Sequence, residues 1–245
     1  MEKTEQIKNK GEKRRKMKAV MIKGHMDTAR FSIPGWNGKR GETYPLPPFS
    51  TVTGMIHFLC RWDSWHEMKI SVAGNGVMNK PEICMRWRGG AVAGSETEEF
   101  KQRFPARVKS GDSFVGWVNT PIYENIVSDL DLRLHIMPEN QNEVDIIYKK
   151  ILNPRTFPSL GRHEDLIRID DVQVVDILPA REMVLDMCSY APATAETPGT
   201  VYTIHKNYTI SKGKRKFNDI QTKYLDKGMK VVTDCDNLNN PFFFI

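Results

Sequence analysis

The sequence predicts an α+β fold in which two strand–helix–strand units share one antiparallel four-stranded sheet with both helices on one face, the split βαβ or ferredoxin-like arrangement. The order of patterns is the main observation. A strand pattern, an amphipathic helix pattern and a second strand pattern follow one another in residues 16–73, and the same order returns in residues 130–178. The chain has 245 residues, of which 40% are apolar, so it is long enough to bury a core.

The first unit begins with an apolar run over residues 16–24 that ends at a glycine, as expected of a buried strand. After Pro47 and Pro48, Ser50 is expected to cap a helix, because a serine side chain can accept a hydrogen bond from a free helical N–H group. Residues 68–73 then alternate between apolar and polar, as a half-buried strand does. The helix between them carries one apolar stripe: Val52, Met55, Ile56, Leu59 and Cys60.

The second unit repeats this order. Residues 130–136 alternate strictly, residues 144–152 have helical spacing before Pro154, and residues 172–178 form another apolar run. Short β-rich segments beyond Pro179 predict a smaller C-terminal β-rich subdomain, residues 181–245. The closing residues 241–245 are too apolar to be left in water, so we expect them to dock on the protein itself or on a neighbouring subunit.

A basic, glycine-rich segment, about residues 75–120, lies between the two units and predicts an inserted β-hairpin. The main domain is therefore expected over residues 17–180, after a basic N-terminal extension of residues 1–16. Contact with a phosphate backbone and a merely solvated loop are both open for the insertion, since positioning contacts on nucleic acids are mostly from arginine and lysine. Its candidate residues are Arg86, Trp87, Arg88, Arg103, Arg107 and Lys109.

The loop over residues 25–49 interleaves cations, glycines and aromatic residues. Glycines allow a backbone to approach a phosphate closely, cations supply countercharge, and an aromatic ring offers a face to an unstacked base. The net charge of +6 also favours a polyanionic partner. A mobile surface loop with one core-facing aromatic residue fits the pattern equally well. The candidate residues are Arg30, Trp36, Lys39, Arg40 and Tyr44.

Gly54 lies inside the first predicted helix, where a glycine costs about 1 kcal/mol relative to alanine. Close packing of the helix against the sheet is the commoner reason for such a glycine, and close approach of a nucleic acid is the alternative. Gly54, His57 and Arg61 all lie off the apolar stripe.

No cofactor or metal is predicted. The sequence has no Walker loop, no dinucleotide fingerprint, no nucleophile elbow and no histidine or cysteine pair at metal-binding spacing. The four cysteines are expected to be reduced, no stretch approaches the roughly 20 apolar residues that span a bilayer, and the cytoplasm is the expected compartment. Acid–base cleavage of RNA stays possible, because it needs only a few side chains; the candidates are His25, Tyr44, His57 and His163.

Two motifs carry a family resemblance: Tyr44-Pro-Leu-Pro-Pro-Phe-Ser-Thr-Val-Thr-Gly-Met55 and Phe157-Pro-Ser-Leu-Gly-Arg-His-Glu-Asp165. With the first strand, they resemble the Cas-five family of CRISPR-associated proteins, RAMP-type subunits of type I Cascade complexes, and residues 68–72 resemble its type I-B branch. The resemblance implies a ferredoxin-like, RRM-related core that holds the 5′ handle of the CRISPR guide RNA, and a hairpin thumb at the insertion. It also implies contacts with the Cas-seven backbone subunit and the Cas-eight large subunit, and with target DNA through the complex.

The resemblance favours a binding role without catalytic residues, in which the protein caps the guide RNA. The alternative is a metal-independent endoribonuclease that processes precursor guide RNA, as in type I-C systems; a subunit that meets only other proteins is a third possibility. Arg162 and His163 belong to the second motif and face either RNA or a protein neighbour. The RNA-binding candidates are Arg30, Trp36, Lys39, Arg40, Tyr44, Ser50, Arg86, Trp87, Arg88, Arg103, Arg107, Lys109, Arg162 and His163.

Overall fold

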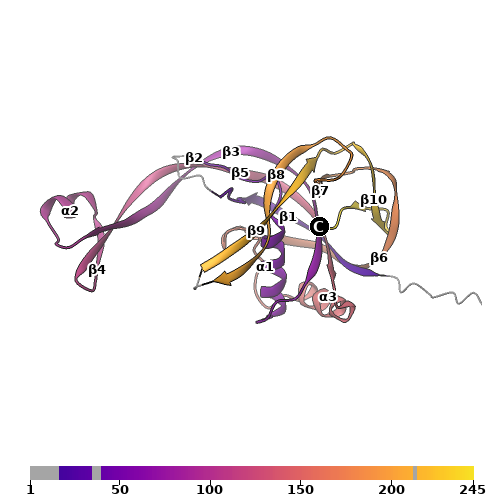
Figure 1. Cartoon of the computed structure of the whole chain (residues 1–245), viewed down its shortest axis with the longest axis horizontal. Helices are drawn as coiled ribbons and strands as arrows, with labels where there is room; N and C mark the ends of the chain where they lie inside the picture. Colours follow the sequence, from indigo (N-terminus) through magenta and orange to yellow (C-terminus); the bar gives the residue numbers. More distant parts are fainter. Residues whose placement is uncertain (1–16, 35–39, 212–213) are drawn as a thin grey trace, which may run out of the picture.

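A computed structural model describes residues 17–34, 40–211 and 214–245 and shows an α+β protein built around one large sheet (Figure 1). The strand order is β11-β10-β6-β1-β5-β3-β7-β9-β8, with β2 and β4 paired to β5 beside this path. The elements are β1 (Lys18–Ala29), β2 (Arg40–Gly41), α1 (Phe49–Cys60), β3 (Met68–Ala93), α2 (Glu98–Arg103), β4 (Ala106–Ser110), β5 (Ser113–Pro138), a 3-10 turn (Gln141–Glu143), α3 (Val144–Leu152), β6 (Arg168–Val184), β7 (Cys188–Pro192), β8 (Thr200–Ser211), β9 (Lys214–Leu225), β10 (Lys230–Asp236) and β11 (Pro241–Phe242).

The centre of the sheet contains both predicted strand–helix–strand units. Strands β6, β1, β5 and β3 lie side by side and all three pairs are antiparallel. Helix α1 connects β1 to β3, and α3 connects β5 to β6. Apolar residues of both helices pack on the same face of β1 in one continuous core, among them Ile56 of α1, Ile147 of α3 and Ile22 of β1. The expected α+β class and the apolar stripe of α1 are therefore confirmed. In α3, Val144, Ile147 and Ile151 are buried, whereas Leu152 is exposed.

Helix α1 begins earlier than the sequence predicts. The backbone N–H groups of Thr51 and Val52 donate to the carbonyl of Pro48, at 3.0 and 3.2 Å, so Pro48 is the N-cap and Ser50 lies in the first turn without a capping hydrogen bond. The expectation that Ser50 caps the helix is wrong. Proline fits a helix start because its fixed φ suits the turn and its missing N–H would have no helical partner there.

The insertion is a long two-stranded arm, formed by β3 and β5 where they continue beyond the core (Figure 1). We call residues 80–123 the arm. Its far end carries α2 and β4, which the hairpin prediction lacked. Successive residues of a strand point to opposite faces, so Arg86 and Arg88 lie on one face while Trp87 lies on the other. Trp87 shares its face with the exposed residues Ile83 and Met85.

The C-terminal strands extend the sheet at both edges. Strand β7 pairs with β3 and is followed by β9 and β8, while β10 pairs with β6 at the opposite edge. The terminal Ile245 exchanges two backbone hydrogen bonds with Ile70, at 3.1 and 3.4 Å. Phe244 packs against the cluster of Ala19, Met21 and Val175, on the sheet face opposite the helices. The closing apolar residues thus dock on the protein itself, the first of the two expected outcomes.

Candidate nucleic-acid interface

Three arginines from distant parts of the chain meet at the base of the arm around the carboxylate of Glu124. Arg30 follows β1, Arg86 lies on β3, and Arg162 lies in the loop before β6. Their guanidinium nitrogens are 2.9, 2.9 and 3.7 Å from the Glu124 carboxylate oxygens, respectively. We call Arg30, Arg86 and Arg162 the arginine cluster. Three of the arginines expected to bind RNA, each from a different segment of sequence, are thus brought together.

Buried carboxylates hold the arginine cluster in place. The Glu124 side chain is only 3% exposed. Burial acts to raise its pKa, but the hydrogen bond from Arg86 and the charge of Arg30 outweigh burial and lower that pKa, so Glu124 is ionised. The buried Asp165 accepts two hydrogen bonds from the Arg162 guanidinium, at 2.7 and 2.9 Å, and a third from the backbone N–H of Arg30 at 3.2 Å. Such partners fix the orientation of the guanidinium groups before any ligand arrives.

Two glycines make room for Arg30. A Cβ atom on Gly41 would lie 2.2 Å from an Arg30 guanidinium nitrogen. Gly161 has a φ of +112°, a conformation that favours glycine, and a Cβ there would lie 3.0 Å from the Arg30 carbonyl oxygen. Gly41 comes from the loop that the sequence marked as a possible phosphate-binding segment, and Gly161 comes from the second resemblance motif. Here they let two loops close around one arginine.

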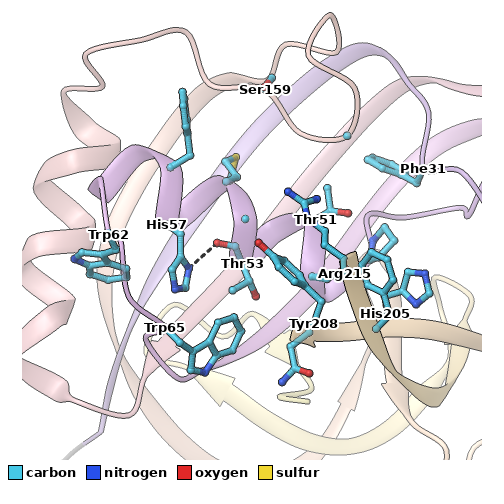
Figure 2. Close-up of a pocket in the computed structure, with 18 of the residues that line it drawn as sticks. Phe31, Thr51, Thr53, His57, Trp62, Trp65, Ser159, His205, Tyr208 and Arg215 are labelled. Atoms are coloured by element: carbon cyan, nitrogen blue, oxygen red, sulfur yellow. Dashed lines mark hydrogen bonds between the residues drawn. The ribbon is translucent and has the colours of Figure 1, made fainter. Parts of the chain in front are cut away.

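A groove of about 940 Å³ runs along α1 (Figure 2). Arg30 and Arg162 are among the residues that line it. We call it the α1 groove. One wall comes from α1 and the loop that follows it, where Trp65 stacks on His57 with ring centroids 5.3 Å apart. The other wall is the β8–β9 hairpin, where Phe217 stacks on His205 at 4.0 Å. The groove therefore joins the arginine cluster to two aromatic walls.

Our sequence interpretation missed the β8–β9 hairpin. It contributes Tyr208 and Arg215 to the groove, and the Arg215 guanidinium lies 4.7 Å from the centre of the Tyr208 ring. The sequence does carry a signal: residues 212–216 read Lys-Gly-Lys-Arg-Lys between two β-rich segments, which is typical of a basic hairpin. No local pattern shows that this hairpin packs beside α1, more than 140 residues earlier in the chain.

Gly54 lies exposed on α1 and lines the groove. A Cβ atom built on it would meet no other atom within 4 Å. The expected explanation, close packing against the sheet, is therefore wrong, because the face of α1 that carries Gly54 points away from the sheet. The helix cost of this glycine, about 1 kcal/mol, is not offset by a close contact with any described part of the protein.

Tyr44 is placed in the core instead of on the surface. It is 3% exposed, and its hydroxyl donates a hydrogen bond of 2.6 Å to the carbonyl of Thr203. Burial raises the pKa of its hydroxyl, so that group stays protonated. The ring has no free face for a base, and we remove Tyr44 from the candidate interface; it is the core-facing aromatic residue of the alternative interpretation.

The histidines considered for RNA cleavage are not assembled into one site. His57 donates from Nδ1 to the carbonyl of Thr53 at 2.9 Å (Figure 2) and accepts at Nε2 from the backbone N–H of His66 at 3.1 Å. Burial lowers the pKa of His57, which is therefore neutral with both nitrogens in use. His25 bonds to Asp131 at 2.7 Å on the sheet face opposite Met26 and the helices. His163 is almost fully exposed and contacts Glu164.

The remaining candidates are dispersed. At the end of the arm, Arg107 bonds to Glu96 and to the carbonyls of Phe104 and Pro105, while Arg103 lies over the Phe104 ring. Lys109, Arg88 and Trp87 are exposed. The backbone of Arg40 pairs with Tyr123 in β2. Trp36 and Lys39 lie outside the described residues.

The described part of the chain contains no group of three or more His, Cys, Asp or Glu side chains arranged to hold a metal ion. Within the same residues, no helix combines the length and the apolar character needed to cross a membrane. The four cysteines are free thiols, and Cys60 and Cys235 are buried.

Neither protein-family models nor curated proteins give a match to this sequence. Several solved structures match it in fold. One, described as a CRISPR RNA-guided surveillance complex, matches 86% of this chain and 91% of its own chain, with a TM-score of 0.50 and 12% identity. Another, a CRISPR protein from Archaeoglobus fulgidus, matches 93% of this chain and 99% of its own, with a TM-score of 0.51 and 11% identity. The chain is thus similar in fold, over most of its length, to known CRISPR proteins.

Proposed function

We propose that this protein is a non-catalytic subunit of a type I CRISPR surveillance complex, resembling the Cas-five family and its type I-B branch, that binds and caps the 5′ handle of the guide RNA. The convergence of Arg30, Arg86 and Arg162 on Glu124, with Arg30 and Arg162 also lining the α1 groove, carries the proposal. The likeness in fold to a chain of a CRISPR RNA-guided surveillance complex supports the same role.

The strand order supports a ferredoxin-like core within residues 17–180. Strands β6, β1, β5 and β3, with a helix in each crossover on one face, have the order and directions of a split βαβ sheet. In this proposal the arm is the thumb, and residues 181–245 form a β-rich extension of the core. The arm and the sheet edges would meet the Cas-seven backbone subunit and the Cas-eight large subunit, and target DNA would be reached through the complex.

Oriented guanidinium groups are suited to RNA phosphates. An arginine presents several N–H donors in a rigid plane, and two of them can bind one phosphate. Arg86 keeps a side chain that is 39% exposed while bonded to Glu124, so part of its donor set faces solvent. Base pairing of the guide would then supply sequence specificity, while the protein supplies position.

The test is the salt dependence of RNA binding. The probe is a fluorescein-labelled single-stranded RNA with the repeat-derived 5′ end of the guide, titrated with wild-type, Arg30→Ala and Arg162→Ala protein. Each lost phosphate contact should reduce the slope of log K against log salt by about one. Arg181→Ala is the matched control, because Arg181 is exposed at the far end of β6 and bonds to Asn239. Slopes equal to that of the wild type in both test variants would contradict the proposal.

The competing function, metal-independent cleavage of precursor guide RNA, has a separate test. The bonding of both His57 nitrogens to backbone groups supports the non-catalytic proposal, because such a ring has no site free to accept a proton. Purified protein should leave a labelled repeat transcript intact in EDTA. A discrete cut that disappears in His25→Ala or His57→Ala protein would establish the enzyme instead.

A further inference from the structure

The α1 groove combines three features that no fold requirement explains. It has an aromatic wall on each side (Figure 2), an exposed glycine on the helix between them, and cations in its lining. Arg30 and Arg162 come from the arginine cluster, and Arg215 comes from the hairpin. Asp63 is the one acidic side chain among the described residues that line it. A ligand that fits has flat apolar faces and negative charge.

Gly54 narrows the choice of ligand further. Its missing side chain leaves open space above α1, with nothing of the described protein within 4 Å of a built Cβ atom. A glycine weakens a helix, and here no close internal contact compensates. An external group that approaches the helix backbone more closely than a methyl group allows would give this glycine a use.

The two aromatic walls hold the rings that could stack on a base in different ways. The Trp65 ring is stacked on His57 and is itself about half exposed. On the hairpin, Tyr208 is covered on one side by Arg215, an arrangement that orients both groups. A planar base can therefore pack against Trp65 on one wall or Tyr208 on the other, with its phosphate directed toward the arginines of the lining.

We propose that the α1 groove holds an unstacked base of single-stranded RNA, with the nucleotide seated against the bare backbone at Gly54 and its base against the aromatic walls. This inference rests on the proposed function and adds a specific site to it. It assigns a role to Trp65, Tyr208 and Arg215, none of which belongs to the arginine cluster. RNA bound at the arginine cluster would continue along α1 into the groove.

The decisive variant is Gly54→Ala, because it should improve folding and impair binding. The added methyl group favours the helix, so the midpoint of thermal unfolding should rise by about 2–4 °C. The same methyl group would occupy the space that the nucleotide uses. Affinity for the labelled guide RNA probe should therefore fall at least about fivefold, the lower end of what one stacked base contributes.

Ile146→Ala is the control. Ile146 is exposed on α3 and does not line the α1 groove, and alanine favours the helix there as it does at position 54. Its affinity for the probe should equal that of the wild type. A second readout uses 2-aminopurine in place of each probe base in turn. Fluorescence at one position should be quenched on binding, and Trp65→Ala or Tyr208→Ala should restore it.

The outcomes separate this inference from the proposed function. Weaker binding by Gly54→Ala together with a position-specific quench supports the groove site. Unchanged affinity of Gly54→Ala, with Arg30→Ala and Arg162→Ala still weakened, overturns the groove site and leaves the function standing. A wild-type protein that does not bind the probe at low salt overturns both.

Discussion

Replacing Glu124 by glutamine sets two physical effects against each other. The carboxylate is 3% exposed and contacts Arg30 and Arg86 at 2.9 Å each. If net charge decides, removing a negative group near the RNA should raise the affinity for RNA. If the orientation of the arginines decides, the affinity should fall. The glutamine amide would present N–H donors to one of the guanidinium groups, and that group would no longer be held in its orientation. We expect Glu124→Gln to weaken RNA binding.

The stability change can be estimated from the same geometry. Breaking a buried ion pair by removing one partner costs about 3–5 kcal/mol. Arg86 is 39% exposed and partly screened by water, which places the cost near the lower end, about 3 kcal/mol. For a chain of this size, each kcal/mol lowers the midpoint of thermal unfolding by about 2–4 °C. Glu124→Gln should therefore unfold roughly 6–12 °C below the wild type.

The assay needs thermal unfolding followed by circular dichroism and a probe titration at a temperature where both proteins are folded. Glu182→Gln is the matched control: Glu182 is exposed on β6, where it lies opposite Val232 in the β6–β10 register. It loses the same charge without disturbing the cluster, so its unfolding midpoint should stay close to that of the wild type. Tighter RNA binding by Glu124→Gln than by the wild type would refute the preorganisation argument.

Two further predictions concern buried groups outside the arginine cluster. Tyr44→Phe removes the hydroxyl bonded to Thr203, so it should cost about 1 kcal/mol in the free energy of unfolding, measured in urea, with no change in RNA affinity; weaker RNA binding would return Tyr44 to the interface. The free energy of unfolding should also fall as the pH drops below about 6.5. Burial lowers the pKa of His135 in the folded chain, so below that pH the histidine is protonated in the unfolded chain before it is protonated in the folded chain. His135→Gln should flatten this fall in unfolding midpoints between pH 7 and pH 5, and an unchanged fall would mean that another group causes it.

Much of the fold follows from local sequence patterns. Period-2 spacing identified β3 and β5, continuous apolar runs identified β1 and β6, and period-3.6 spacing identified both helices, because each of these elements contributes to the same core. The start of α1 was misjudged by two residues, since Pro48 supplies the cap that Ser50 was expected to give. Such boundaries depend on backbone geometry that residue types alone do not fix.

The candidate site was harder to predict, because it depends on contacts between distant segments. Arg30, Arg86 and Arg162 lie in three separate segments of the sequence. No local pattern shows that the carboxylates of Glu124 and Asp165 bring these arginines together. Tyr44 was misjudged because burial by the β8–β9 hairpin is a long-range event. The grouping of Trp87 with its neighbouring arginines overlooked the alternation of side chains along β3.

That alternation gives the arm a built-in rule about length. On β3, Arg86 and Arg88 point to one face and Ile83, Met85 and Trp87 to the other, because the positions of the two sets differ in parity. Inserting one residue between the core and position 83 would move each of these side chains to the opposite face of the strand. Inserting two residues would restore the original faces, so related chains that keep this separation on β3 should vary in the length of this segment in even steps.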